Sequence, residues 1–369
     1  MKEVFKKLPF ISALRGYAIL LVIILHTSQY GTKLTSIFWD RLVNKGHFGV
    51  QLFFLASAFT LFLSLSHREE SESNPTRNFY IRRFFRIAPL YYLGIIYYLF
   101  QNQLSGRAAI VPGLDHPIDL ILNISFLNGF NPNTVRTIVP GGWSISAEVI
   151  FYLMLPFLFK VIKNEKHALN FLLFTLIFRG AIIEFFKRHI LITDVDTWKN
   201  FTYFNFLNHL PVFAMGIFMF FITTKKDNFK FNPNAIFLFV LLAFMQLSIS
   251  LPFMLPAHIL YSFLFLLFAL ALHSKMPKVL VNKFINYIGE ISFSMYLSHF
   301  AVIYWLTHFK LINFFNNQLV NFGFKYTCIV LITILISSFL YFLIEKPFQQ
   351  IGKNLILKLE LRNIKYQLI

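Results

Sequence analysis

Charged residues are scarce in this chain. They make up 14% of its 369 residues, whereas 57% are hydrophobic; a soluble domain has about 25% charged residues. A water-soluble fold of this length would need far more polar surface, so we expect the excess of apolar side chains to face lipid. The mean hydropathy of +0.61 points the same way.

Cysteine is almost absent as well. The one cysteine, Cys328, lies within an apolar run, which excludes an intrachain disulfide and a cysteine-based metal site. We therefore expect no metal site and no permanently bound cofactor.

Acidic residues are few compared with basic ones. The 16 Asp and Glu residues stand against 34 Lys and Arg residues, which gives a formal net charge of +18. Basic residues of a membrane protein concentrate in its cytoplasmic loops. The positive charge of this chain therefore helps to show which loops are cytoplasmic, and we expect no nucleic-acid partner.

The start of the chain looks at first like a signal peptide, because Lys2, Lys6 and Lys7 precede an apolar stretch. However, Arg15 and His26 interrupt that stretch, and no site of small residues for cleavage follows it. We expect this segment to be retained as a membrane span.

Ten segments are long and apolar enough to cross a bilayer, which takes about 20 residues. The predicted fold is all-α: a polytopic membrane bundle of about ten transmembrane helices. One membrane-embedded domain would cover 1–369, with spans over about 10–345 and a short cytoplasmic tail at 346–369. The segments lie near 10–30, 48–66, 84–101, 143–159, 168–186, 203–222, 235–250, 256–273, 290–309 and 323–344.

An even number of spans places both termini on one side of the membrane. About two thirds of the 34 Lys and Arg residues fall in the loops on that side, so the positive-inside rule places both termini in the cytoplasm. The longest external loop, about 102–142, contains an apolar stretch at 118–127 that predicts a short interfacial helix.

The first span carries two ionisable residues, Arg15 and His26. They are 11 residues apart, about three helical turns, and therefore share a face with roughly 16 Å between them along the axis. Ionisable groups inside spans are costly and are functional candidates by default. The alternative is that Arg15 extends to the interface and His26 is a hydrogen-bonded core histidine.

Two arginines, Arg83 and Arg86, open the third span from the cytoplasmic side. Their i, i+3 spacing puts them on one helix face, where two guanidinium groups can bind phosphates bidentately. Positive-inside anchoring is the alternative explanation.

The fourth span opens with Trp143 and Ser144, and Ser144 or Ser146 is expected to cap its helix. Ser144, Glu148 and Tyr152 follow at i, i+4 and i+8, so they form one polar stripe. A carboxylate about one turn into the membrane indicates a site, although an early acidic residue also favours the helix dipole.

The ninth span presents Ser292, Tyr296 and His299 on one face, which suits either a substrate contact or hydrogen bonding between helices. After the tenth span, Glu345, Lys346 and Pro347 predict an interfacial ion pair and a helix stop.

Taken together, these segments resemble the membrane-bound acyltransferase-3 family, and they occur in the order found in that family over nearly the whole chain. One departure is Ala58, where the family usually has glycine between serine and phenylalanine. The stretches that carry the resemblance are Leu14 to Ala18 with His26, Phe48 to Phe59, Arg83 to Tyr92, Trp143 to Tyr152, Ser292 to His299 and Glu345 to Pro347.

The resemblance implies a ten-span domain that uses acyl-CoA, often acetyl-CoA, as donor substrate. Acceptors in the family are commonly sugar hydroxyls of lipopolysaccharide, exopolysaccharide, peptidoglycan or root-nodulation oligosaccharides. Its key span-1 residues map to His26 and Arg15, and its Arg-x-x-Arg pair maps to Arg83 and Arg86. The expected protein is an O-acyltransferase of the bacterial cytoplasmic (inner) membrane that modifies a cell-surface glycan such as O-antigen, exopolysaccharide or a lipid-linked sugar.

In the expected mechanism, the phosphates of acyl-CoA bind Arg83 and Arg86, helped by Arg15, and the thioester reaches His26. His26 acts either as a general base on the acceptor hydroxyl or as a nucleophile that forms an acyl-histidine. Glu148 orients the imidazole or the acceptor.

Other side chains are assigned to stabilising and binding roles. An oxyanion formed at the thioester needs a donor, for which Ser57, Tyr152 and Arg15 are the candidates. The residues expected to contact the acceptor are Trp143, Ser144, Tyr152, Tyr296 and His299.

The main alternative from another class is a polytopic transporter of an anionic small molecule or a glycan precursor. A transporter predicts inverted repeats and broken helices, and the sequence shows neither. Within the enzyme interpretation, the acyl chain, the acceptor sugar and its hydroxyl position, and the oligomeric state stay open.

Overall fold

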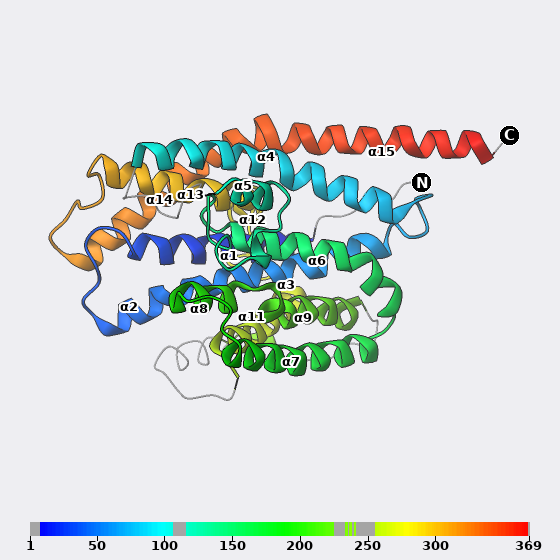
Figure 1. Cartoon of the computed structure of the whole chain (residues 1–369), viewed down its shortest axis with the longest axis horizontal. Coiled ribbons are helices and arrows are strands. Elements are labelled where there is room, and N and C mark those ends of the chain that lie inside the picture. The colour runs from blue at the N-terminus through cyan, green and yellow to red at the C-terminus, as the bar shows by residue number, and fades with distance from the viewer. Residues whose placement is uncertain are drawn as a thin grey trace. The chain divides into compact units, whose positions relative to one another are not determined.

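The computed structural model describes residues 8–105, 116–224 and 255–367, with isolated positions between 233 and 240. Within these residues the chain is all-helical and has no strand, which confirms the predicted fold class. Its α-helices are α1 Pro9–Ser28, α2 Ile37–Asn44, α3 Gly49–Ser66, α4 Pro75–Ser105, α5 Pro117–Ile124, α6 Gly142–Val161, α7 Glu165–Arg188, α8 Val195–Phe204, α9 Phe206–Thr224, α11 Ala257–Lys275, α12 Lys283–Glu290, α13 Ser292–His308, α14 Gln318–Leu340 and α15 Lys346–Gln367 (Figure 1).

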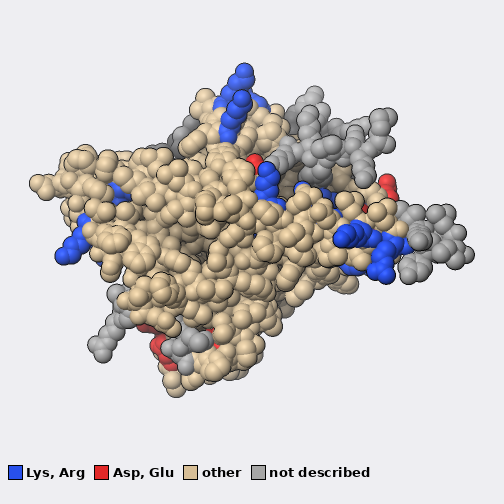
Figure 2. Space-filling view, turned by 90° about the horizontal axis from the view of Figure 1, so that it is seen from above, with Lys and Arg blue, Asp and Glu red and all other residues tan. Residues whose placement is uncertain are grey.

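Seven helical segments of the described chain have the length and apolarity needed to cross a membrane, and each coincides with a predicted span. Much of the surface in Figure 2 is uncharged, and its Lys and Arg side chains gather in a few separate groups. Such a surface suits contact with lipid. The seven segments are Pro9–Ser28, Ile37–Ser66, Gly142–Val161, Glu165–Arg188, Val195–Thr224, Ala257–Lys275 and Gln318–Asn363.

The other three predicted spans have different outcomes. The span at 84–101 lies within α4, a 31-residue helix whose arginine, tyrosine and glutamine residues reduce its hydropathy. The span at 290–309 corresponds to α13, which has 17 residues. The span at 235–250 lies almost entirely outside the described residues. The count of ten and the cytoplasmic termini therefore stay predictions.

The helix stop predicted at Glu345-Lys346-Pro347 is wrong. A π-helical turn, Tyr341–Glu345, joins α14 to α15, and helix continues to Gln367. Proline is tolerated at the first turn of a helix because its missing N–H is not needed there, and the wider π turn is one way in which a helix absorbs a break in its hydrogen-bond ladder. Glu345 is 2% exposed and accepts a hydrogen bond from Gln349 at 3.1 Å.

The chain divides into two compact units, each built from segments far apart in sequence. The first comprises Met1–Phe59 and Val212–Ser337, and the second comprises Thr60–Pro211 and Ser338–Ile369. The first unit contains the candidate residues Arg15, His26, Tyr296 and His299, and the second contains Arg83, Arg86, Trp143, Ser144, Glu148 and Tyr152.

Small residues fix the position of α1 in the first unit. A Cβ atom added to Gly289 of α12 would lie 1.8 Å from the carbonyl oxygen of Ser12, and one added to Gly49 would lie 2.4 Å from that of Ala18. Glycine lets helix backbones approach this closely. The helix that carries Arg15 and His26 is therefore held tightly by its neighbours.

The contacts of Ala58 explain how the chain does without glycine at that position. Ala58 is fully buried in α3 and faces Gly216 of α9. A Cβ atom on Gly216 would lie 2.7 Å from the Cβ atom of Ala58 and 2.4 Å from the carbonyl oxygen of Leu55. The glycine that permits close packing here is on the opposite helix.

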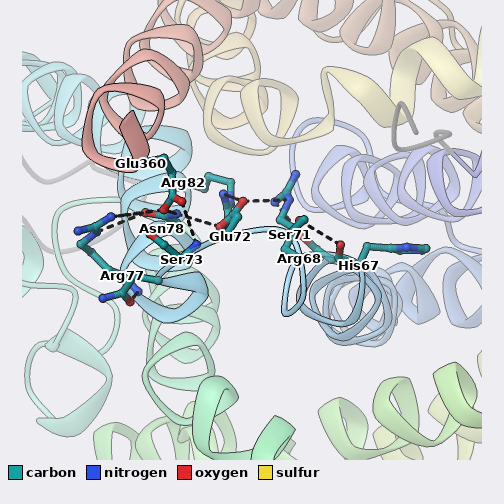
Figure 3. Close-up of polar contacts among 11 residues, drawn as sticks. His67, Arg68, Ser71, Glu72, Ser73, Arg77, Asn78, Arg82 and Glu360 are labelled. Carbon is teal, nitrogen blue, oxygen red and sulfur yellow. Dashed lines mark hydrogen bonds and ion pairs between the residues drawn. The ribbon is translucent and has the colours of Figure 1, made fainter. Parts of the chain in front are cut away.

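In the second unit, α15 lies along α4 (Figure 1). Gly352 of α15 packs on Phe85, where an added Cβ atom would be 2.9 Å from the Cβ atom of Phe85. At the start of α4, Glu360 accepts hydrogen bonds from the Asn78 side chain at 2.7 Å and the Ser73 backbone at 2.8 Å (Figure 3). The C-terminal helix thus anchors the helix that carries Arg83 and Arg86.

Candidate active site

His26 lies near the C-terminal end of α1 and is partly buried. Its Nδ1 atom lies 2.9 Å from Oε1 of Gln29, one helical turn further on. An amide oxygen only accepts hydrogen bonds, so Nδ1 carries the proton and Nε2 keeps the lone pair in the neutral ring. In this tautomer the lone pair of Nε2 can act as a base or a nucleophile.

A second histidine lies beside His26. The ring centroids of His26 and His299 of α13 are 5.4 Å apart, and the ring of Phe300 lies 4.3 Å from the first and 4.2 Å from the second. The ring centroid of Tyr296 lies 5.8 Å from that of His299. The structure thus brings together three of the predicted residues, His26, Tyr296 and His299.

Arg15 occupies the same unbroken helix as His26, 11 residues earlier, as the spacing predicted. It is partly buried. A different residue of α13, Ser298, forms a hydrogen bond between helices: its hydroxyl lies 2.8 Å from that of Ser337 in α14.

The arginines of α4 differ in their partners. Arg82 makes a bidentate ion pair with Glu72 at 2.7 and 3.0 Å, and Arg68 approaches the same carboxylate at 3.7 Å (Figure 3). Among the described residues, no ion pair joins Arg83 or Arg86 to a carboxylate. Glu72 therefore pairs with Arg82 and not with Arg83 or Arg86.

Arg83 projects into an aromatic setting. Its guanidinium carbon lies 5.9 Å from the ring centroid of Phe79 and 6.0 Å from that of Tyr152. Its Nε atom is buried without a hydrogen-bond partner. A buried donor left unpaired is costly, and an anionic ligand would satisfy it.

Glu148 interacts with residues of its own unit. The hydroxyl of Tyr152, one turn later on α6, hydrogen-bonds to the carboxylate of Glu148, and both side chains interact electrostatically with Arg83. Of the predicted polar stripe on α6, Glu148 and Tyr152 thus interact with each other. The role predicted for Glu148, orienting the imidazole of His26 or the acceptor, stays a prediction.

The start of α6 differs from the prediction. The helix is preceded by Gly141 in a left-handed conformation with φ of 76°, so neither serine caps it. Ser144 donates to the Gly141 carbonyl at 2.9 Å, and Ser146 donates to the Phe126 carbonyl at 2.7 Å. A glycine can adopt this positive φ and start the turn without a side-chain cap.

Trp143 belongs to an aromatic cluster. Its ring lies 4.6 Å from that of Phe204 and 5.2 Å from that of His209. The indole is partly buried, so its orientation is fixed by packing and part of it is exposed.

Comparison with known families bears directly on this arrangement. The sequence profile of the acyltransferase-3 family, described as an acyltransferase domain, matches residues 8–342. The chain belongs to this family. The family consists of acyltransferases, and seven helical segments of the described chain have the length and apolarity of membrane spans.

One relative of this acyltransferase is acyltransferase MdmB of Streptomyces mycarofaciens. The two are 29% identical over 175 residues, which is 43% of this chain and 41% of the relative. The chain thus aligns with less than half the length of that relative. No solved structure matches the acyltransferase.

Two residues near the imidazoles of the acyltransferase were missed by the sequence analysis. Gln29 follows His26 at i+3, and this helical spacing was the one signal that pointed to it. Phe300 is one of 49 phenylalanines, and nothing in the sequence distinguishes it from the others. Among the described residues, no group of three or more His, Cys, Asp or Glu side chains is arranged to hold a metal ion.

Proposed function

We propose that this protein transfers an acetyl or other short acyl group from acyl-CoA to a hydroxyl of a cell-surface glycan, such as O-antigen, exopolysaccharide or a lipid-linked sugar. The observation that carries the proposal is the His26–Gln29 pair. An imidazole with Nδ1 held by an acceptor and Nε2 free has the arrangement needed for a base or nucleophile in acyl transfer.

The donor is proposed to bind through Arg83 and Arg86, helped by Arg15. Two arginines one turn apart, with no ion pair to a carboxylate in the described chain, suit the phosphate groups of CoA. The unpartnered Nε atom of Arg83 adds a donor that a phosphate oxygen would satisfy. Glu148 and Tyr152 interact electrostatically with Arg83.

The acceptor is proposed to contact Trp143, Ser144, Tyr152, Tyr296 and His299. The partly exposed indole of Trp143 offers an aromatic face for a sugar ring. The setting we propose is the bacterial inner membrane, with one domain over residues 1–369 and both termini in the cytoplasm, where acyl-CoA is made.

The direct test uses purified protein in lipid nanodiscs with labelled acetyl-CoA. We expect His26→Gln to abolish consumption of acetyl-CoA, because Nε2 is lost while the protein stays folded. Ser28→Ala is the matched control, since Ser28 donates to the Leu25 carbonyl on the same turn of α1. Undiminished turnover in the His26 variant would refute the assignment.

The glycan acceptor is tested in cells. Deletion of the gene should remove O-acyl signals from the NMR spectrum of the surface polysaccharide, and the wild-type gene should restore them. An unchanged spectrum would exclude a surface glycan as acceptor and leave the acyltransferase reaction in place.

A further inference from the structure

His299 has an unusual hydrogen-bonding state. Its side chain is fully buried. Its Nδ1 atom donates to the carbonyl oxygen of Met295 at 3.1 Å, whereas its Nε2 atom has no hydrogen-bond partner. A carbonyl only accepts, so the neutral ring carries its proton on Nδ1 and its lone pair on Nε2.

An unpartnered buried acceptor is destabilising, and native proteins contain few of them. This one lies beside the candidate catalytic imidazole, with 5.4 Å between the two ring centroids. Reacting atoms lie about 3–3.5 Å apart before a bond forms, so the 5.4 Å between the ring centroids is of the size expected for two groups that serve one reaction.

The two imidazoles therefore present equivalent chemistry. Gln29 holds Nδ1 of His26 and Met295 holds Nδ1 of His299, and each ring offers Nε2. Phe300 packs against both rings and limits their reorientation. A single general-base mechanism uses one such nitrogen, whereas a route through an acyl-enzyme uses two.

We infer that His26 is the acyl-accepting nucleophile and that His299 is the general base that activates the acceptor hydroxyl. This inference rests on the proposed function. In the first step, Nε2 of His26 attacks the thioester carbonyl, the carbon–sulfur bond breaks, and CoA leaves as a thiolate. The product is an acyl-imidazolium whose Nδ1–H is held by Gln29.

In the second step, the acceptor oxygen attacks the acyl carbon while Nε2 of His299 takes the hydroxyl proton. The bond between the acyl carbon and Nε2 of His26 breaks, and its electron pair returns to His26 as the lone pair. The proton on His299 is released and balances the CoA thiolate, so the sum is acyl-CoA plus alcohol giving ester plus CoA. His26 cannot supply the base in this step because its Nε2 is acylated.

The test separates the two half-reactions in nanodiscs. Acetyl-CoA is mixed with the protein without acceptor, and CoA release and acetylation of His26 are measured by quenched-flow mass spectrometry. Discharge of the acetyl group is then followed with water and glycerol as hydroxyl probes. Hydroxylamine serves as a probe that attacks without a base.

His299→Gln and His299→Asn should still release CoA and carry acetyl on His26. Their discharge into water and glycerol should be at least about tenfold slower than that of the wild type, since general-base catalysis contributes about 10²–10⁴-fold. Discharge by hydroxylamine should be unchanged, and added imidazole should restore part of the lost rate. Ser298→Ala is the control on the neighbouring residue.

Discharge of the His299 variants at the wild-type rate would overturn the inference. So would a wild-type enzyme that consumes acetyl-CoA without ever carrying acetyl on His26, although the proposed function would then stand. If both variants misfold, the wild-type discharge is compared in H₂O and D₂O, and the lack of an isotope effect counts against His299. A wild type that never consumes acetyl-CoA would refute the proposed function itself.

Discussion

At the scale of single residues, the chemistry depends on which ring nitrogen keeps its lone pair. Gln29 directly follows α1, and its amide oxygen lies 2.9 Å from Nδ1 of His26, one helical turn earlier. Side chains that orient a reactive imidazole through its second nitrogen fix both tautomer and ring position. Gln29 is therefore expected to support catalysis without touching the substrate.

Replacing Gln29 tests that role. Gln29→Leu should lower kcat about 10- to 100-fold, by analogy with the loss of a partner that orients a metal-bound histidine, with little change in KM for acetyl-CoA. Gln29→Glu keeps an acceptor oxygen and should retain most activity. If the leucine and glutamate variants are equally active, the hydrogen bond has no catalytic role.

Adjacent arginines give a second prediction. Arg83→Ala should raise KM for acetyl-CoA about 10- to 100-fold, because hydrogen bonds between charged groups contribute about 1.5–3 kcal/mol. Arg82→Ala breaks the pair with Glu72, so it should lower thermal stability and leave KM unchanged. If both variants changed KM equally, the assignment of Arg83 to donor binding and of Arg82 to a structural ion pair would be wrong.

The sequence was informative about residues to different degrees. Ionisable groups within apolar spans stand out, so Arg15, His26 and Glu148 could be proposed as site residues from their positions alone. The unpaired Nε2 of His299 was not predictable, because it depends on the tertiary surroundings of the ring. The link between Glu148 and Arg83 joins α6 to α4 and likewise required tertiary structure.

At the scale of elements, helix contacts in this protein depend on glycines. Gly289→Ala would push a methyl group into the backbone of Ser12, which lies 1.8 Å from the added atom. Overpacking of this kind costs about 1–3 kcal/mol, so we expect a lower unfolding temperature in nanodiscs and reduced activity through displacement of α1.

Gly323→Ala is the matched control for the Gly289 variant. It lies in α14, and no atom lies within 4 Å of its added Cβ atom. The substitution should leave the unfolding temperature unchanged or raise it, because alanine favours helix by up to about 1 kcal/mol. If both variants were equally stable, close packing at Gly289 would be unimportant.

Element boundaries show why sequence patterns succeed and fail here. Long apolar runs predicted the positions of α1, α6, α7 and α11 well, because an apolar stretch of about 20 residues is enough to indicate a membrane-spanning helix. Pro347 was taken as a stop, but the π turn at Tyr341–Glu345 carries the helix past it. Local signals cannot foresee such a turn when tertiary packing stabilises it.

At the scale of the whole molecule, topology is the main open prediction. In a Cys328→Ala background, a cysteine at Lys358 should react with a membrane-impermeant maleimide only after cells are permeabilised, because we place the C-terminus in the cytoplasm. A cysteine at Asn133, in the predicted external loop, should react without permeabilisation. Labelling of the Lys358 position from outside would reverse the topology.

The interleaved units have a consequence for biosynthesis. Residues 338–369 belong to the same unit as residues 60–211, and Glu360 bonds to Asn78, 282 positions earlier. A nascent chain therefore enters the bilayer long before the ribosome makes the helix that secures α4. Premature termination at any late codon would leave that helix unsecured, so quality-control proteases should remove shortened products even when every apolar segment has been inserted.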